Sequence, residues 1–386
     1  MRRILWWIAG LLGAPGCTVG PDSTGASPAV WQVSAEPVLV IGADETRAGH
    51  QLYDVRSALR LADGRIVVVN GGSSEIRYYA QDGTYQMAVG GQGRGPMEFE
   101  RIANVARAQG DTIVVLTGDP AVAWVADGRV VRKVPFNRAA LRVPCRIDES
   151  PGILSDGSQL LHLEDNPGGA GCRPLASDFH QKTTLVARFA ADTTPMDSIG
   201  VFPGTDRDGD RYALFGRRLA AAASLGRIFA GETGGDTVGV FSYDGEHLAT
   251  LRVPLERAPI PESVRSWQPE PRRMPDGTVV PIAPYTIPER YPRFGRLLVD
   301  LAGNLWVMRY PASATPFGSY ILEGIRGVRY LTAGAEWTVI APDGAALATV
   351  RTPPGFHVYE IGEDYILGVG LNELDVQSVR MYALER

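Results

Sequence analysis

The sequence predicts an all-β protein that folds as a six-bladed β-propeller, and three observations favour this class. The chain has 386 residues. That length exceeds what one ordinary core can organise, so the chain holds either two domains or a repeat whose core grows unit by unit. Its 45 glycines and 28 prolines favour many short strands joined by turns. The third observation is a four-strand pattern that recurs about six times along the chain.

The clearest repeat unit runs from Leu59 to Gly91. Its apolar runs are joined by two Asp-Gly turns, Asp63-Gly64 and Asp82-Gly83. Asp-Gly between apolar runs is a strong hairpin signal, because type I′ turns need positive φ angles. Four antiparallel strands in about 40 residues are typical of one propeller blade. The first turns of the further units fall near Gly110, Asp156, Gly226, Gly303 and Glu363-Asp364, and the second turns at Asp127, Asp192, Asp244 and Asp343.

The two ends of the repeat region complete each other. The last unit ends with its third strand, VQSVRMYALER, and the missing fourth strand is PVLVIG, Pro37–Gly42. An N-terminal strand that closes the last blade removes exposed sheet edges, which otherwise invite aggregation. A β-sandwich, the alternative fold, would not explain why one strand is missing at one end and one is left over at the other.

A glycine-rich stretch, GGQGRGPMEF (Gly90–Phe99), follows the first unit. A phosphate-binding loop needs Gly-x-x-x-x-Gly-Lys-Ser/Thr, and a dinucleotide site needs Gly-x-Gly-x-x-Gly at the start of a helix. Here no lysine follows the glycines, and the next residues begin a strand. We therefore expect a crossing between two blades with Phe99 wedged between them. Arg94 and Glu98 are expected either to pair with each other or to face a ligand.

This stretch matches a Gly-x-Gly-x-Gly-Pro-Gly-Glu-Phe corner through Gly91, Gly93, Gly95, Pro96, Glu98 and Phe99, with Met97 in place of the last glycine. In this corner, in LLVDLAGNLWV (Leu297–Val307) and in the closing YILGVGLNELDVQSVRMYAL, the chain resembles six-bladed β-propeller lipoproteins of environmental and gut bacteria, which are relatives of NHL-repeat propellers. The resemblance covers nearly the whole mature chain and implies the fold. It implies no single activity, because propellers carry many unrelated functions.

The first residues predict export. Arg2 and Arg3 precede an apolar run that ends near Ala14 and is too short to span a bilayer. Residues 1–16 are therefore predicted to be a signal peptide that is removed from the mature protein.

The end of this segment predicts a lipid anchor. Small residues before Cys17 resemble the bacterial lipobox, in which the cysteine is lipidated and becomes the mature N-terminus. The alternative is a plain cleaved signal with an incidental cysteine. Residues 17–36 are expected to form the anchor and a flexible tether, and residues 37–386 the propeller. Because Thr18 rather than Asp follows the cysteine, we expect a bacterial cell-envelope protein in the outer membrane that faces the periplasm or the surface.

The remaining two cysteines, Cys145 and Cys172, predict one disulfide in an oxidising compartment. Two free, buried thiols are the alternative.

The formal net charge is −5 and the isoelectric point is about 5.7. Proteins that bind nucleic acid usually have a basic face, so this charge argues against a nucleic-acid partner.

The inner strand of each blade lines the axial funnel, and a cationic residue lies in or just before each of these strands. A ring of such groups could focus a positive field on an acidic ligand. Because arginine is common in this chain, chance placement is the alternative. The residues of this predicted funnel ring are Arg56, Arg101, Arg142, Arg217, Arg296 and His357.

The largest departure from the repeat is a proline-rich insertion at residues 256–292. An insertion of this length usually covers one face of a propeller, and loops often carry function. We expect Trp267, Arg272 and Tyr285 to bind a peptide or a glycan there. A packed cover without a ligand is the alternative.

No catalytic constellation is evident. The histidines lack zinc-site spacing, and no Gly-x-Ser-x-Gly elbow occurs. The stretch TDRDGD (Thr205–Asp210) resembles the start of a calcium loop, but Arg211 and Arg217 replace the glycine and glutamate that such a loop requires. We therefore expect no cofactor, with calcium as the alternative.

These observations favour an envelope lipoprotein that acts as a binding or interaction module, with an envelope protein, a peptide or a glycan as its partner. The alternative is a propeller hydrolase or lyase that acts on a carbohydrate or a lactone in the axial funnel.

Overall fold

The computed structural model describes residues 28–44, 46–108, 110–118, 121–135, 146–164, 180–192, 194–208, 211–224, 226–282, 284–311 and 333–386. Cys17, Cys145, Cys172, Arg142 and the signal peptide lie outside these ranges, so lipidation and the disulfide stay predictions. No helix within the described ranges has the length and apolar character needed to cross a membrane.

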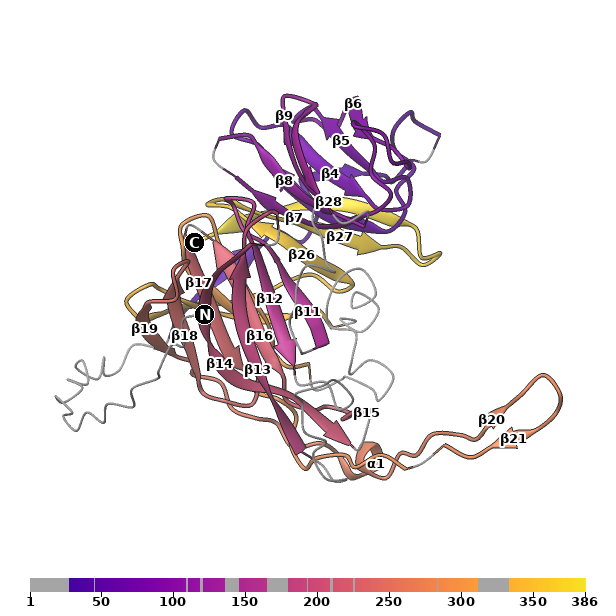
Figure 1. Cartoon of the computed structure of the whole chain (residues 1–386), viewed down its shortest axis with the longest axis vertical. Helices are drawn as coiled ribbons and strands as arrows, with labels where there is room; N and C mark the ends of the chain where they lie inside the picture. The colour runs from indigo at the N-terminus through magenta and orange to yellow at the C-terminus, as the bar shows by residue number, and fades with distance from the viewer. Residues whose placement is uncertain are drawn as a thin grey trace, which may run out of the picture.

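The described strands build an all-β protein in which four sheets of antiparallel strands stand separately (Figure 1). The first two contain β3 (Val55–Arg60), β4 (Ile66–Asn70), β5 (Glu75–Tyr79) and β6 (Tyr85–Gly90), then β7 (Ile102–Arg107), β8 (Ile113–Thr117), β9 (Ala121–Ala126) and β10 (Arg129–Pro135). The third contains β11 (Arg146–Ile153), β12 (Gln159–Glu164), β13 (His180–Phe189), β14 (Pro195–Asp208) and β15 (Arg211–Tyr212). The fourth contains β16 (Leu219–Ser224), β17 (Arg227–Glu232), β18 (Thr237–Ser242) and β19 (His247–Arg252).

The remaining large sheet has nine strands. It contains β22 (Phe294–Val299), β23 (Leu305–Arg309), β24 (Glu336–Ile340), β25 (Ala346–Arg351), β26 (Phe356–Ile361), β27 (Tyr365–Leu371), β28 (Gln377–Glu385), β1 (Ala29–Val33) and β2 (Leu39–Ile41). The strand β2 pairs antiparallel with β28, which confirms that Pro37–Gly42 supplies the missing strand.

The six separate blades predicted from the sequence are not found, and β1 is the reason. Its residues, which we expected in the tether, pair parallel with β25 through Ala29–Trp31 and antiparallel with β28 through Gln32–Val33. Two runs of four strands are thereby joined into one sheet.

The sheets follow one another in a propeller-like ring. β3 contacts β7, β7 contacts β11, β14 contacts β16, β16 contacts β22, and β26 contacts β3. Between β22 and β26, Arg296 donates a hydrogen bond to the carbonyl oxygen of Val358 at 2.8 Å. Four of the five contacts named above join the first strands of neighbouring runs, and the fifth joins β14 to β16.

The Asp-Gly turns form as expected, but by two different geometries. At Asp127-Gly128 both residues have positive φ angles, 47° and 69°, as a type I′ turn requires. At Gly64 and Gly83 only the glycine is left-handed. There the preceding aspartate accepts a hydrogen bond from the backbone N–H two residues later, at 3.0 Å for Asp63 and 2.9 Å for Asp82.

The glycine-rich corner joins the first two sheets. Phe99 is fully buried in an apolar cluster with Ile76 and Ile102, which confirms the predicted wedge. Glu98 accepts a hydrogen bond from the Gly95 N–H at 2.9 Å, and Arg94 pairs with Glu100 at 2.8 Å. Of the two alternatives for Arg94 and Glu98, their pairing with each other is not found, because Arg94 pairs with Glu100 and the turn binds the Glu98 carboxylate.

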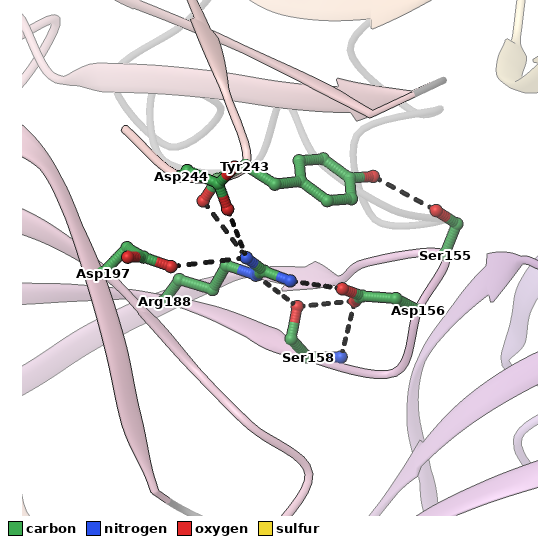
Figure 2. A network of polar contacts seen from close by, with 7 residues as sticks. All are labelled: Ser155, Asp156, Ser158, Arg188, Asp197, Tyr243 and Asp244. Atoms are coloured by element: carbon green, nitrogen blue, oxygen red, sulfur yellow. Dashed lines mark hydrogen bonds and ion pairs between the residues drawn. The ribbon is translucent and has the colours of Figure 1, made fainter. Parts of the chain in front are cut away.

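A buried arginine braces the third and fourth sheets (Figure 2). Arg188 of β13 donates to the Ser158 hydroxyl at 2.9 Å and pairs with Asp156, in the turn between β11 and β12. It also lies 3.4 Å from Asp197 and 3.5 Å from Asp244, which belongs to the turn between β18 and β19. One guanidinium thus holds two carboxylates of its own sheet and reaches the fourth sheet through Asp244 and the Tyr243 carbonyl, which accepts a hydrogen bond at 3.3 Å.

The insertion begins beside the ring and extends away from it. It contains α1 (Glu262–Arg265) and a hairpin of β20 (Arg272–Arg273) and β21 (Val279–Val280). Figure 1 shows this orange hairpin projecting away from the sheets. The tip of the insertion therefore does not cover a face of the propeller as expected. The neck of the insertion, residues 256–267 and 284–292, packs against the core of the ring.

Candidate functional site

A tight turn between β14 and β16 positions Arg217. The backbone N–H of Ala213 donates to the Asp206 carbonyl at 3.0 Å, and the N–H of Asp206 donates to the Arg217 carbonyl at 2.8 Å. Between them Phe215 has a φ of 52°, which is left-handed and strained for a bulky side chain. Such strain persists only where surrounding contacts impose it, and it is common at binding sites.

Asp206 holds the Arg217 side chain in place. The buried Asp206 carboxylate accepts from the Arg217 backbone N–H at 2.8 Å, from its Nε at 3.0 Å and from its Nη2 at 3.2 Å. These hydrogen bonds raise the pKa of Arg217. Glu232 Oε1 lies 3.5 Å from the same Nε. The alternative prediction is a calcium site at TDRDGD. Its first ligand would be the Asp206 carboxylate, which binds Arg217 instead.

The neck of the insertion positions two further arginines. Its two segments meet at an isolated antiparallel bridge between Pro259 and Arg290. Arg257 donates Nε to the Tyr291 carbonyl at 2.9 Å and Nη2 to the Arg290 carbonyl at 3.0 Å. Arg290 returns one hydrogen bond from Nη1 to the Arg257 carbonyl at 2.9 Å. Both guanidinium groups are thus fixed by backbone oxygens.

The electrostatic environment of Arg257 is positive. Burial and the charges of Arg217, Arg293 and Arg290 lower its pKa, and only Glu232 opposes them. Positive groups held close together at a protein surface attract anions, because the low-dielectric wall reduces screening.

These segments enclose one cavity of about 310 Å³. Its wall contains Asp206, Phe215, Arg217, Arg257, Pro288, Glu289 and Arg290. Behind the wall, the Phe215 ring meets Tyr291 edge-on at 5.1 Å, and Tyr291 stacks on Tyr310 at 5.6 Å. The cavity therefore combines a rigid aromatic support with arginine forks, which suit carboxylate and phosphate groups.

Three members of the predicted funnel ring lie around another residue, Tyr359. Arg56 and Arg296 both act electrostatically on Tyr359, and His357 meets its ring edge-on at 5.0 Å. The Tyr359 hydroxyl donates to the Val55 carbonyl at 2.6 Å. Burial raises the pKa of Tyr359. This cluster thus joins β26 to β3 at the inner end of the sheets.

The ring residues differ in their own partners. Arg56 pairs with Asp54 at 2.6 Å. His357 is buried, and burial together with the charge of Arg296 holds the pKa of His357 well below its ordinary value. The imidazole of His357 is therefore neutral. Arg101 is exposed and lies over Gly118, where a Cβ would meet the Arg101 Cβ at 2.9 Å.

The described members of the predicted ring thus do not share one site, and a ring around the axis stays a prediction. Arg217 lines the cavity, while Arg56, Arg296 and His357 surround Tyr359. Arg142 lies outside the described residues.

Two of the predicted insertion residues, Trp267 and Tyr285, lie outside the cavity wall. Trp267 and Tyr285 are half-buried, with ring centroids 6.3 Å apart, and they pack against the core cluster that contains Tyr291. They therefore anchor the insertion. Arg272 lies on β20 opposite Val280.

Within the described ranges, no three His, Cys, Asp or Glu side chains are grouped closely enough to hold a metal ion.

Comparison with known proteins supports the fold. No protein-family model matches the chain, and no curated protein sequence matches it. A crystal structure of a DUF4221-family member from Bacteroides vulgatus is similar with a TM-score of 0.55 at 11% identity, over 93% of this chain and 99% of that one. This similarity supports the all-β, propeller-like arrangement described above.

Two weaker similarities were also found. A candidate exported protein from Bacteroides fragilis has a TM-score of 0.47 at 11% identity, over 92% of this chain and 96% of that one. A gluconolactonase from Xanthomonas campestris has a TM-score of 0.38 at 15% identity, over 95% of this chain and all of that one.

Sequence reasoning missed Arg257, Arg290, Glu289 and Phe215. Arg257 and Arg290 could have been found from the sequence, because they lie at the two ends of the proline-rich insertion. The two ends of a long insertion lie close together where the chain rejoins the fold. Phe215 carries no such signal, because its left-handed backbone depends on the turn that Asp206 stabilises.

Proposed function

We propose that this protein is a non-catalytic binding protein of the bacterial cell envelope, and that its ligand or partner binds in the cavity between Arg217 and the neck of the insertion. One observation carries the proposal. Among the described residues, Arg257 and Arg290 line the cavity and hydrogen-bond to backbone carbonyls, and neither forms an ion pair with a carboxylate.

This arrangement favours binding for an energetic reason. Arg257 is half-buried without an ion-pair partner, which is unfavourable, and an incoming anion relieves that cost, whereas Arg290 is exposed and accessible to the same anion. The backbone hydrogen bonds also hold both side chains before a ligand arrives, so less rotamer freedom is lost on binding.

The proposed architecture is a six-bladed propeller of the NHL-like type. In this account the nine-stranded sheet is two blades, β22–β25 and β26–β28 with β2, and β1 links their outer parts. The support comes from the antiparallel order within each run and from the contacts that close the ring.

The proposed anchor is a lipid on Cys17. The structure begins to describe the chain at residue 28, so a tether of about ten residues would reach up to roughly 35 Å from the membrane. That length lets the cavity meet a partner at the membrane or in the periplasm. Cys145 and Cys172 would be oxidised there.

The test is crosslinking in intact cells, followed by purification and mass spectrometry. Wild type, Cys17→Ala, Arg290→Gln and Arg129→Gln are compared, since Arg129 is an exposed residue of β10, outside the cavity wall. We expect one partner with wild type and Arg129→Gln, and its loss with the other two. Equal recovery with Arg290→Gln would refute the cavity as the site. Conversion of a captured ligand by the purified protein would favour the hydrolase or lyase alternative.

A further inference from the structure

The cavity wall restricts the chemistry of what it can hold. We infer that the ligand is an acidic sugar, meaning a ring with several hydroxyl groups and one carboxylate, such as a uronic acid or a glycan unit that contains one. This inference rests on the proposed function and specifies the ligand class of the same site.

The charge of the wall fits one carboxylate. Three arginines face two carboxylates, from Asp206 and Glu289, which leaves one positive charge. Two charged groups outside the wall, Arg293 and Glu232, also act on Arg257, and their charges have opposite signs. A ligand with a single negative charge therefore neutralises the site, whereas a phosphate dianion would leave an excess of negative charge.

The free donors fit the shape of a carboxylate. Arg290 uses only Nη1 for its backbone hydrogen bond. Its Nε and Nη2 therefore form a free edge, and this edge can grip both carboxylate oxygens in parallel. Arg257 uses Nε and Nη2 on carbonyl oxygens, so its Nη1 is the group left for the ligand.

The other wall residues fit a hydroxylated ring. The Glu289 carboxylate has no hydrogen-bond partner among the described residues and can accept from hydroxyl groups, as ionised carboxylates only accept. Pro288 and Phe215 supply the apolar part of the wall, which suits the C–H face of a sugar ring. A ligand that combined a carboxylate with an apolar chain would place carbon atoms against the charged Glu289 side chain. That contact is unfavourable, because the Glu289 carboxylate would lose its hydrogen bonds to water without replacement.

The size of the cavity limits the ligand. About 310 Å³ lies at the low end of the range for small-molecule sites, which begins at roughly 300 Å³. One sugar ring can enter, and the remainder of a longer glycan would extend into solvent.

The experiment is isothermal titration of the purified full chain with four sodium salts or sugars: glucuronate, glucose, acetate and phosphate. Glucose has the hydroxyl groups without the carboxylate, and acetate has the carboxylate without the ring. We expect glucuronate to bind at least tenfold more tightly than each of the other three.

Variants then connect the binding to the arginines. We expect Arg290→Gln to weaken glucuronate binding at least tenfold, and Arg290→Lys to weaken it less, because lysine keeps the charge but lacks the fork. Arg129→Gln serves as the matched control and should bind as wild type does. Thermal melting of each variant shows that it is folded.

Three results would overturn the inference: equal affinity for glucose and glucuronate, equal or tighter binding of phosphate, or no binding of any probe. If one of these occurs while the cellular partner still depends on Arg290, then the proposed binding function stands and only the ligand class is wrong. If the cellular partner is also independent of Arg290, both fail.

Discussion

Replacing Arg188 by methionine should destabilise the junction of the third and fourth sheets. Arg188→Met keeps an apolar stem of similar length and removes the guanidinium that contacts the groups shown in Figure 2. The side chain is only 8% exposed. Loss of the Arg188 guanidinium therefore leaves its polar partners without a hydrogen-bond donor at a site with little access to water.

The magnitude follows from the contacts. The hydrogen bond to Ser158 contributes about 1 kcal/mol, and the charged hydrogen bond to Asp156 contributes about 2 kcal/mol. Asp244 is 85% exposed, so its ion pair adds little. The total is about 3 kcal/mol as an upper value, because the Asp156 side chain is 41% exposed and solvent screens its pair with Arg188.

The assay is urea unfolding at pH 7, followed by tryptophan fluorescence. Arg129→Met on an exposed position should change the free energy of unfolding by less than about 0.5 kcal/mol. A loss below about 0.5 kcal/mol for Arg188→Met would refute the view that this guanidinium stabilises the third sheet beside its junction with the fourth.

The effect should also depend on pH. Burial acts to raise the pKa of Asp156, but hydrogen bonds from Ser158 and the charge of Arg188 outweigh it and hold that pKa below its ordinary value of 3.8. A carboxyl with a lowered folded-state pKa adds stability above the unfolded pKa and loses it as pH falls through the folded pKa. The difference between wild type and Arg188→Met should therefore shrink below about pH 3.8. A difference that grows with acid would contradict this.

Three further predictions concern the fold and the export signals. Gly90→Ala should cost at least about 2 kcal/mol in urea unfolding, because its φ is 97° and a Cβ would lie 2.6 Å from the Phe99 ring; Gly226→Ala, with φ 76° and open space, should cost only about 1 kcal/mol, and equal costs would refute the steric argument. Tyr359→Phe should cost about 1–2 kcal/mol because the Val55 carbonyl loses its donor, and an unchanged melting temperature would show that this contact contributes nothing. Cys145 and Cys172 should resist thiol labelling in protein purified from the envelope until a reductant is added; immediate labelling of both would show free thiols.

Local patterns predicted much of the fold because they depend on neighbouring residues. Asp-Gly turns, the wedge at Phe99 and the closing strand Pro37–Gly42 all follow from turn chemistry or strand count. The pairing of Ala29–Val33 could not be predicted in this way, since parallel pairing with β25 depends on residues more than three hundred positions away.

The candidate site was harder to predict for the same reason. Arg217 was found as one cation in a suspected ring, but its real neighbours, Arg257 and Arg290, come from the two ends of the insertion. His357 was expected to face the funnel and is instead buried, because the direction of a side chain depends on register and on a bulge at Val358–Glu360.

The measurement that tests the central claim most directly is photo-crosslinking in living cells from one defined position. A photoreactive amino acid is placed at Pro288 in the cavity wall, or at Val131 on the exposed side of β10, where 61% of the residue is exposed. The account predicts an adduct of defined mass from position 288 that is absent from position 131 and disappears with Arg290→Gln. An adduct from position 131 alone, or one at position 288 that survives Arg290→Gln, would contradict it.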